Sequence, residues 1–228
     1  EQAFGEIEKR ASRQSLPTVL VPLEEAVGRV LAEPAVAKLS IPPFDNSARD
    51  GVVLSASALS AATSGSPVRL AAELRAGDSL EVANGIEGDA ARIMTGAPVP
   101  LWAESIVMIE DLILNDDGTA TVNRLPESGA WIRPKGSDIA ETSVILKPGR
   151  QIIPEHVQAL ASSGFVEAVI HVKPRVGLCS TGEELVDVKS GPPGSGQIYD
   201  SNRPFMTAMM RSFGCDVVVN EHVGDTLD

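Results

Sequence analysis

The chain has 228 residues, a formal net charge of −12, and 43% hydrophobic and 22% charged residues. Such a composition is typical of a globular protein and excludes the disordered and fibrous classes. The negative charge argues against nucleic acid or an anionic membrane as a general partner, because the field of the protein repels both. No signal-peptide pattern and no apolar run of membrane-spanning length occurs, so we expect a cytoplasmic location and no membrane partner.

Two helices are predicted at the start of the chain. Apolar residues in 4–11 recur at helical spacing, so this segment is expected to form an amphipathic helix that ends before Pro17. A second helix is expected over residues 23–32, and Pro22 stands just ahead of it, where the missing N–H of proline costs nothing.

From Ser40 to about Ile139 the pattern changes to short apolar runs separated by Gly, Pro, Asn and Asp, and we expect no helix longer than one or two turns. The runs are Val68–Leu70, Ala91–Met94, Ile106–Ile109, Thr119–Val122 and Trp131-Ile132. Asn115-Asp116-Asp117-Gly118 indicates a hairpin, because Asp-Gly accepts the positive φ angles of tight turns. This stretch is therefore predicted to be a small β-barrel or sandwich.

The last third of the chain is predicted to mix helices and strands. The expected elements are a strand pair (Val144–Leu146 with Arg150–Ile153), a helix from Pro154 closed by Gly164, a strand at 175–179, a helix from about Pro204 to Phe213, and a strand at 216–219. The last three elements form the start of a parallel βαβ unit. Because two strands cannot bury both faces of a parallel sheet, we expect this α/β domain to be incomplete within these residues.

Two polar loops in the β-rich stretch are candidate site elements. In Pro42–Gly51, two prolines stiffen a loop that presents Asp50 to a metal or polar ligand; the alternative is an Asx-capped loop that joins two domains. Thr95-Gly96 follows a strand and exposes a hydroxyl and an N–H that can hold an oxyanion, with Arg92 supplying charge. The alternative for this second loop is an ordinary turn.

Two more loops follow the strands of the βαβ unit. Ligands of open α/β sheets bind at the carboxyl ends of the strands, so Ser180-Thr181-Gly182 is a candidate contact for phosphate or sugar. Glu183 and Glu184 can bind Mg²⁺ or can simply oppose a helix dipole. Ser201 or Asn202 is expected to cap the following helix. Asp225 occupies another strand-end position.

Several kinds of chemistry are not supported. Cys179 and Cys215 are expected to be free and buried, since their strands offset them too far for a disulfide. The three histidines lack the spacing of zinc ligands, and neither a nucleophilic triad nor GxGxxG occurs. Carboxylates, hydroxyls and glycine loops remain, which fits metal-assisted handling of an anionic ligand.

Four runs together resemble the MoeA family of molybdopterin molybdenumtransferases, which includes the E domain of gephyrin: Pro43–Gly51, Arg92–Pro100, Arg175–Leu185 and Gly196–Pro204. They stand in the family's order, and the likeness covers nearly the whole chain. The resemblance implies an α+β multidomain fold. Its parts would be an N-terminal helix (1–16) that packs on the α/β domain, a linking domain (17–40 plus 139–173), an inserted small β-barrel-like module (41–138), and the incomplete start of a three-layer molybdopterin-binding α/β domain (174–228).

The resemblance also implies a reaction, in which molybdate and adenylylated molybdopterin react with Mg²⁺ to give molybdenum cofactor and AMP. Matching motifs assign catalytic roles to Asp50, Thr95, Glu184 and Asp225, with Mg²⁺ on the three carboxylates. Substrate-binding roles would belong to Arg92, Ser180, Thr181, Gly182, Asp200 and Asn202. The implied partners are a second copy in a homodimer and a molybdopterin adenylyltransferase.

The chain departs from the family at two positions of the first motif. The family usually has a small or apolar residue where Arg49 stands and an aromatic residue where Val52 stands, which puts one wall of the pocket in doubt. Two alternatives to the enzyme are a non-catalytic gephyrin-like scaffold and a truncated remnant. A stand-alone molybdopterin-binding module of the adenylyltransferase type is a third, and the β-rich stretch at 41–138 argues against it.

Overall fold

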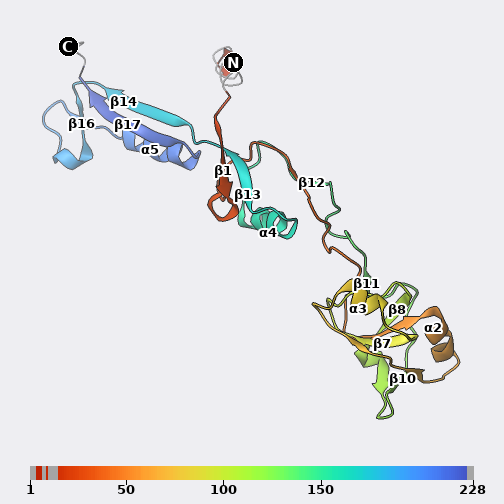
Figure 1. The fold of residues 1–228 in the computed structure, drawn as a ribbon. Helices are drawn as coiled ribbons and strands as arrows, with labels where there is room; N and C mark the ends of the chain where they lie inside the picture. Colours follow the sequence, from red (N-terminus) through yellow and green to blue (C-terminus); the bar gives the residue numbers. More distant parts are fainter. Residues whose placement is uncertain (1–3, 7–8, 10–14, 225–228) are drawn as a thin grey trace. The chain divides into compact units, whose positions relative to one another are not determined.

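The computed structural model describes residues 4–6, 9 and 15–224, which divide into two compact units (Figure 1). Unit 1 comprises Glu1–Ala35, Leu146–Ala161 and Phe165–Asp228, and unit 2 comprises Val36–Ile145 and Ser162–Gly164. Among the described residues, no helix has the length and apolar character needed to span a bilayer.

The two predicted N-terminal helices have different outcomes. Residues 4–6 and 9 are helical, and the rest of the helix expected over 4–11 lies outside the described residues. The helix expected over 23–32 is wrong, because only the single 3-10 turn η1 (Leu23–Glu25) forms.

The physical reason for this error lies at Gly28. Its φ of +78° is incompatible with a right-handed helix. Beyond it, Val30 and Leu31 form isolated β-bridges with Gln151 and Ile170. Tertiary pairing therefore overrides the helical spacing of the apolar residues.

Short antiparallel pairs form the first part of unit 1. The strand β1 (Thr18–Pro22), which was not predicted, pairs with β13 (Glu167–His171), with Thr18 opposite His171. The helix α4 (Pro154–Ser162) forms as predicted, and Gly164 follows it with a φ of +89°.

The predicted pairing of Val144–Leu146 with Arg150–Ile153 is wrong. The strand β12 (Val144–Leu146) pairs instead with β2 (Ala35–Val36). Gly149 still turns the chain with a φ of +79°, but its N–H and the N–H of Ile152 donate to the carbonyls of Leu31 and Arg29. The turn was predicted correctly, and its hydrogen-bond partners come from far along the chain.

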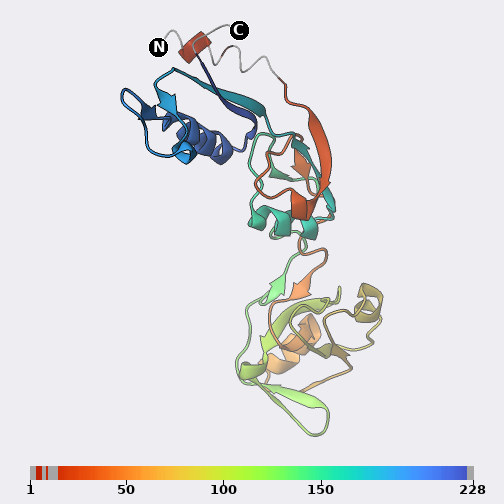
Figure 2. The same cartoon turned by 90° about the vertical axis from the view of Figure 1, so that its left-hand side faces the viewer.

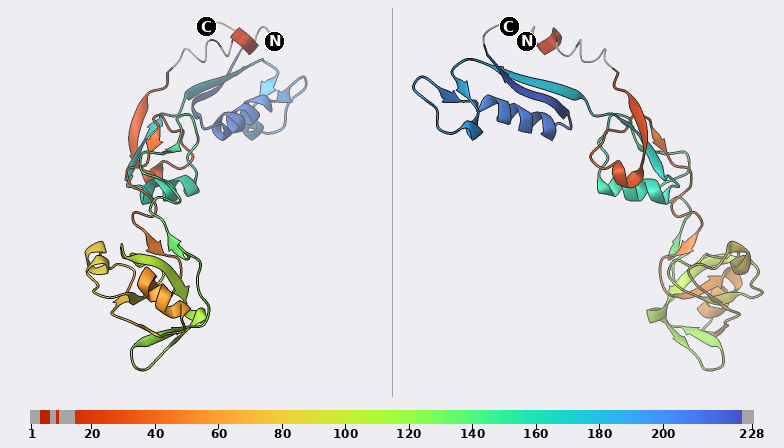
Figure 3. Two further views of the ribbon diagram at one scale, coloured as in Figure 1. Left: turned by 90° about the vertical axis from the view of Figure 1, so that its right-hand side faces the viewer. Right: turned by 60° about the vertical axis from the view of Figure 1, so that its left-hand side comes forward.

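The predicted βαβ unit of unit 1 is confirmed. The strands β14 (Arg175–Thr181) and β17 (Asp216–Val223) are parallel neighbours. The connecting helix α5 (Asn202–Ser212) packs along both strands (Figures 1 and 3). Before α5 the chain forms a minor parallel pair, β15 (Leu185–Val186) with β16 (Ile198–Tyr199), and a 3-10 turn, η3 (Val188–Ser190).

Two open sheets and a short strand pair form unit 2 (Figure 2). The four-stranded sheet has the order β6-β7-β4-β8, the three-stranded sheet β5-β10-β9, and β11 pairs with β3. The bounds are β3 (Asn46–Ser47), β4 (Gly51–Ser55), α2 (Ala56–Thr63), β5 (Val68–Arg69), β6 (Glu73–Leu74), α3 (Leu80–Asn84), β7 (Ala90–Ile93), β8 (Ala103–Met108), η2 (Ile109–Asp111), β9 (Leu112–Leu114), β10 (Thr119–Val122) and β11 (Ile132–Arg133). The described strands close no barrel, so the mixed α and β content is confirmed and the barrel-like form is not.

The core of unit 2 lies on both faces of β4. Val52 and Leu54 belong to one apolar cluster, with residues of α2, β5 and β10, whereas Val53 belongs to a second cluster, with residues of α3 and β7. Every residue of β4 is buried, because alternate side chains enter opposite clusters. This strand fixes the C-terminal end of the loop that carries Asp50.

The hairpin predicted at 115–118 joins β9 to β10. Gly118 has a φ of +79°, and the N–H of Asn115 donates to the carbonyl of Thr119 at 2.9 Å. The prediction is confirmed.

Candidate functional site

Asp50 and Thr95, two of the predicted site residues, lie together in unit 2. Asp50 stands just before β4 and Thr95 just after β7, and these strands are antiparallel with Gly51 opposite Ile93. Because the start of β4 lies beside the end of β7, the two residues lie at the same end of the strand pair. The N–H and the Oγ1 hydroxyl of Thr95 each donate to Oδ1 of Asp50 at 2.7 Å.

Gly51 places this pair through a close backbone approach. A Cβ atom at Gly51 would lie 1.9 Å from the carbonyl oxygen of Val107, so no other residue fits there. The glycine therefore lets β4 pair closely with β8.

The carboxylate of Asp50 is exposed and ionised at neutral pH. The N–H of Thr95 lowers the pKa of Asp50 below its ordinary value, and the Thr95 hydroxyl and the charge of Arg92 add to this effect against a smaller opposing effect of desolvation. Among the described residues no donor is bonded to Oδ2. The site thus presents a fixed, charged carboxylate with one oxygen open.

The donors of Thr95-Gly96 that were expected to hold an oxyanion are bonded within the protein. A hydroxyl has one hydrogen, and that of Thr95 is donated to Asp50. The N–H of Gly96 donates to the carbonyl of Ser47 at 2.8 Å. Both donors are therefore already used within the protein.

Arg92 is also partnered. Its Nη1 lies 3.2 Å from Oε2 of Glu73, a residue that the sequence interpretation missed. Arg92 therefore acts on Asp50 through its charge and not through a direct bond.

The turn at 132–138 contacts the loop that precedes Asp50. The N–H of Lys135 donates to Oδ1 of Asp45 at 2.6 Å, and β11 pairs with β3. The guanidinium of Arg49 lies over the ring of Trp131, 5.1 Å from its centre. Trp131 was predicted in a strand run but not as a site residue, and its φ of +61° is a backbone feature that the sequence does not reveal.

A second candidate site lies in unit 1, at the carboxyl end of β14. It is a cavity of about 300 Å³. Its lining consists of Leu178, Cys179, Ser180, Thr181, Leu185, Asp200, Asn202, Arg203 and Met206. Four of these, Ser180, Thr181, Asp200 and Asn202, are predicted substrate-binding residues, so the cavity brings together loops that are 20 residues apart.

Asp200 is the buried centre of this second site, with its side chain 1% exposed. Ser180 Oγ donates to Oδ2 of Asp200 at 2.6 Å, and Nε of Arg203 donates to the same oxygen at 2.9 Å. Burial raises the pKa of Asp200, but the bonds from Ser180 and Arg203 outweigh burial, and the net pKa is lowered. Arg203 was missed by the sequence interpretation, although it stands in the fourth motif.

The expectation that Ser201 or Asn202 caps α5 is wrong. Ser201 occupies the cap position without a side-chain hydrogen bond. Oδ1 of Asp200 accepts the N–H of Arg203 at 3.1 Å instead. The same carboxylate therefore accepts a hydrogen bond from the start of α5 and lines the cavity.

The remaining predicted residues stand apart from the cavity. Glu184 turns its carboxylate toward Gly182, where a Cβ atom would lie 2.6 Å from Oε2. Gly182 has a φ of +134°, a backbone conformation that favours glycine. Asp225 lies outside the described residues. The cysteines are free as predicted, but Cys179 is exposed and Cys215 half-buried, so the predicted burial is wrong.

Of the three predicted metal ligands, Asp50 and Glu184 belong to different units, and Asp225 lies outside the described residues. Asp50 belongs to unit 2 and Glu184 to unit 1. The described part of the chain contains no group of three or more His, Cys, Asp or Glu side chains placed to hold a metal ion.

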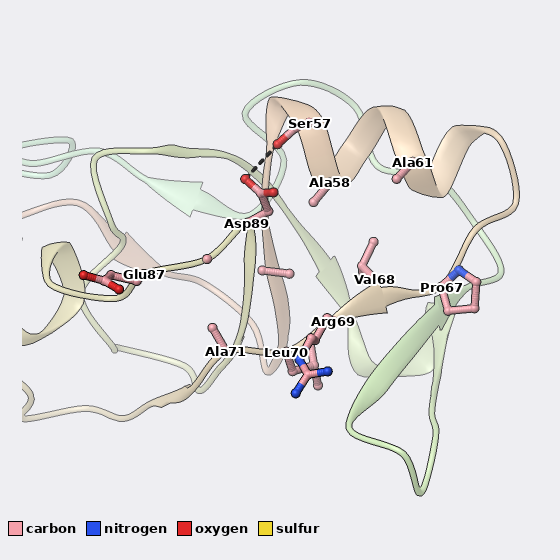
Figure 4. Close-up of a pocket in the computed structure, with 12 residues that line it drawn as sticks. Ser57, Ala58, Ala61, Pro67, Val68, Arg69, Leu70, Ala71, Glu87 and Asp89 are labelled. Atoms are coloured by element: carbon pink, nitrogen blue, oxygen red, sulfur yellow. Dashed lines mark hydrogen bonds between the residues drawn. The ribbon is translucent and has the colours of Figure 1, made fainter.

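A third cavity, of about 530 Å³, lies in unit 2 between α2, β5 and the segment 87–90 (Figure 4). Ser57 Oγ donates to Oδ1 of Asp89 at 2.8 Å on one side of it. Small side chains of α2, Ala58 and Ala61, line it on another side. None of its residues was predicted as part of a site.

The fold assigns the chain to a class of proteins. It is similar to a solved molybdopterin biosynthesis MoeA protein of Pyrococcus horikoshii, with a TM-score of 0.80 and 28% identity over 92% of this chain and 56% of that chain. Residues 1–164 match the family described as the MoeA N-terminal region (domain I and II). The chain belongs to the MoeA family.

Curated relatives agree with this assignment. The chain is 36% identical over 196 residues to the molybdopterin molybdenumtransferase of Haemophilus influenzae, covering 86% of this chain and 47% of the relative. It is 38% identical over 211 residues to molybdopterin molybdenumtransferase 2 of Mycobacterium tuberculosis, covering 91% and 51%. The chain therefore spans about half the length of the curated relatives it matches.

Proposed function

We propose that the chain is part of a molybdopterin molybdenumtransferase, which inserts molybdenum from molybdate into the dithiolene of adenylylated molybdopterin with Mg²⁺ and releases AMP. Membership of the MoeA family supports the assignment. The observation that carries it is the Asp50–Thr95 pair, in which an exposed, ionised carboxylate is held by two donors of one neighbouring residue.

The proposed reaction balances without a redox partner. Two thiols of the dithiolene form sulfur–molybdenum bonds, and one molybdate oxygen leaves as water with their two protons. A water molecule cleaves the phosphorus–oxygen bond that joins AMP to molybdopterin. Molybdenum keeps its oxidation state, so the residues need only bind, orient and compensate charge.

The donor chemistry fits Mg²⁺. Magnesium binds oxygen ligands, and protein carboxylates share its shell with substrate oxygens and water. We propose Asp50, Glu184 and Asp225 as its ligands; when bound, Mg²⁺ would neutralise charge on the phosphate and molybdate oxygens. Thr95 would position Asp50.

The larger organisation is also proposed. We assign an N-terminal helix (1–16), a linking domain (17–40 plus 139–173), a β module (41–138) and a molybdopterin-binding α/β domain from 174. The protein would act in the cytoplasm as a homodimer and would receive its substrate from a molybdopterin adenylyltransferase. A non-catalytic scaffold is the second candidate function.

Asp50→Asn in the full natural protein tests the proposal. The amide keeps the size of the side chain and removes its charge, so folding should be spared. Molybdenum cofactor formation from adenylylated molybdopterin, molybdate and Mg²⁺ should fall by on the order of 100-fold or more, since a metal-directed carboxylate supplies several kcal/mol of charge stabilisation. Asp116→Asn, in the exposed hairpin, is the matched control. Equal activity of both variants would contradict the assignment, and an inactive wild type would favour the scaffold.

A further inference from the structure

Glu73 is bonded to two guanidinium groups in unit 2. Its Oε1 accepts from Nε of Arg75 at 2.8 Å, and its Oε2 accepts from Nη1 of Arg92 at 3.2 Å. The Glu73 side chain is 29% exposed, and that of Arg92 is 40% exposed. Each oxygen of this carboxylate is therefore engaged by a different arginine.

Strand pairing places Arg92 between Glu73 and Asp50. Arg92 of β7 stands opposite Glu73 of β6 on one side and opposite Val52 of β4 on the other. Asp50 precedes Val52 by two residues, which puts it near the diagonal position, where a long side chain reaches its neighbour. The charge of Arg92 contributes to the lowered pKa of Asp50, in agreement with this placement. Arg92 thus stands within reach of both carboxylates.

The bond to Glu73 leaves the second oxygen of Asp50 without an arginine. Thr95 donates twice to Oδ1 of Asp50, and among the described residues no donor is bonded to Oδ2. A guanidinium has five N–H donors in a planar fork that suits carboxylates. Without the Glu73 charge, the attraction toward β6 is lost, and the ionised Asp50 remains as a partner for Arg92.

A guanidinium on Oδ2 would compete directly with a metal ion. It would occupy the lone pairs that a cation needs, and its positive charge would repel a divalent cation at the same oxygen. An Asp50 carboxylate with one oxygen held by Thr95 and the other kept open can instead bind a cation.

We propose that Glu73 is a positioning residue that holds the Arg92 guanidinium away from Asp50, so that Oδ2 of Asp50 stays free for a divalent cation. The identity of that cation as Mg²⁺ rests on the proposed function. The position of Arg92 relative to the two carboxylates does not depend on it.

A crystal structure of the full natural protein with Glu73→Gln, without ligand, tests the position of Arg92. The amide keeps the size of the side chain and removes its charge, so folding should be spared. In the variant, Arg92 should lie within hydrogen-bond distance of Oδ2 of Asp50. An Arg92 guanidinium that stays beside β6 in the variant would overturn the inference.

Mg²⁺ titrations by calorimetry measure the consequence for the cation site. The Mg²⁺ binding that Asp50→Asn removes is compared between the wild type and variants of Glu73 and Arg92. Glu73→Gln should weaken this binding about fivefold, the effect of an exposed ion pair that competes for the same oxygen. Adding Arg92→Gln to that variant should restore most of the affinity, and Arg92→Gln alone should not weaken it. Glu81→Gln, at an exposed position of α3, is the matched control and should bind Mg²⁺ as the wild type does.

The double variant separates positioning from a general effect of charge. If Arg92→Gln changed the Mg²⁺ affinity by the same factor with and without Glu73, the two residues would act independently and the inference would be overturned. A wild type that binds no Mg²⁺ through Asp50 would instead contradict the proposed function. The position of Arg92 in the ligand-free crystal structure would then still decide the role of Glu73.

Discussion

At the residue scale, Asp50 and Thr95 have different roles: Asp50 presents the charged carboxylate, and Thr95 donates hydrogen bonds to it. Thr95 donates its N–H and its hydroxyl to one oxygen of Asp50, and both bonds lower the pKa of that carboxyl. A lowered pKa means that the fold favours the charged carboxylate. The resulting contribution to folding stability is present above the ordinary pKa of aspartate, and it is lost as the pH falls through the lowered pKa of Asp50. Thr95 thus stabilises the charged form of Asp50.

Thr95→Val tests this role in the full natural protein. The variant keeps the backbone bond and loses the hydroxyl bond, so the pKa of Asp50 should rise and the acid limb of the activity profile should move to higher pH. Activity at neutral pH should fall by less than in Asp50→Asn. A carboxyl titration by NMR and a pH–rate profile measure both effects.

Thr95→Ser is the control for that experiment, because it restores the hydroxyl. It should return the Asp50 pKa and the acid limb to their wild-type positions. If Thr95→Val instead left the Asp50 titration unchanged but reduced molybdate affinity, Thr95 would be an oxyanion ligand after all.

At the element scale, strands were missed where a short apolar run has no strong periodicity, whereas the helix wrongly expected over 23–32 did have helical spacing. The strands β1 and β4 are such runs, and periodicity cannot distinguish a buried strand from a short helix. The hairpin, α4 and the βαβ unit were predicted correctly, because turn residues mark their ends. Turn residues therefore determine where elements end, whereas pairing with residues distant in sequence determines whether several segments become strands or helices.

Gly28→Ala tests the turn that interrupts the expected helix. Nothing lies within 4 Å of a Cβ atom at Gly28, so the cost comes only from the φ of +78°. The free energy of unfolding should fall by about 1–2 kcal/mol, the penalty for an ordinary residue in the left-handed region. Urea unfolding measures this.

Gly28→Asn is the matched control, since asparagine tolerates the left-handed region. It should lose clearly less stability than alanine. A more stable alanine variant would indicate that the helix over 23–32 forms after all.

At the scale of the whole molecule, unit 2 has a core of its own. Both apolar clusters around β4 consist only of residues from unit 2. Residues 36–145 expressed alone should therefore fold and unfold cooperatively, as followed by circular dichroism in urea. Ile106→Ala, at a fully buried position, should cost this fragment about 2–5 kcal/mol. Leu101→Ala, at a side chain that is 90% exposed, should cost little. A fragment without a cooperative transition would contradict the independence of unit 2.

The α/β part of unit 1 leads to a different expectation. On β17, Val218 and Val219 are 43% and 45% exposed, and a parallel sheet normally buries both faces. We therefore expect the 228 residues alone, supplied with adenylylated molybdopterin, molybdate and Mg²⁺, to give no repeated turnover. Turnover at the rate of a full-length relative, measured in the same assay, would place the whole active site in these residues.

The sequence by itself determined the family, the mixed α and β content and the identity of the motif residues, because these depend on residue types in a fixed order. It also determined the hairpin, both ends of α4 and the C-terminal end of α5, since glycine and proline act locally. Only the tertiary structure decided which residues are hydrogen-bonded to one another. Thr95 donates to Asp50, and both Arg203 and Ser180 donate to Asp200. A hydrogen bond between segments 45 residues apart is fixed by strand pairing, and the direction in which each hydroxyl donates depends on its neighbour in space.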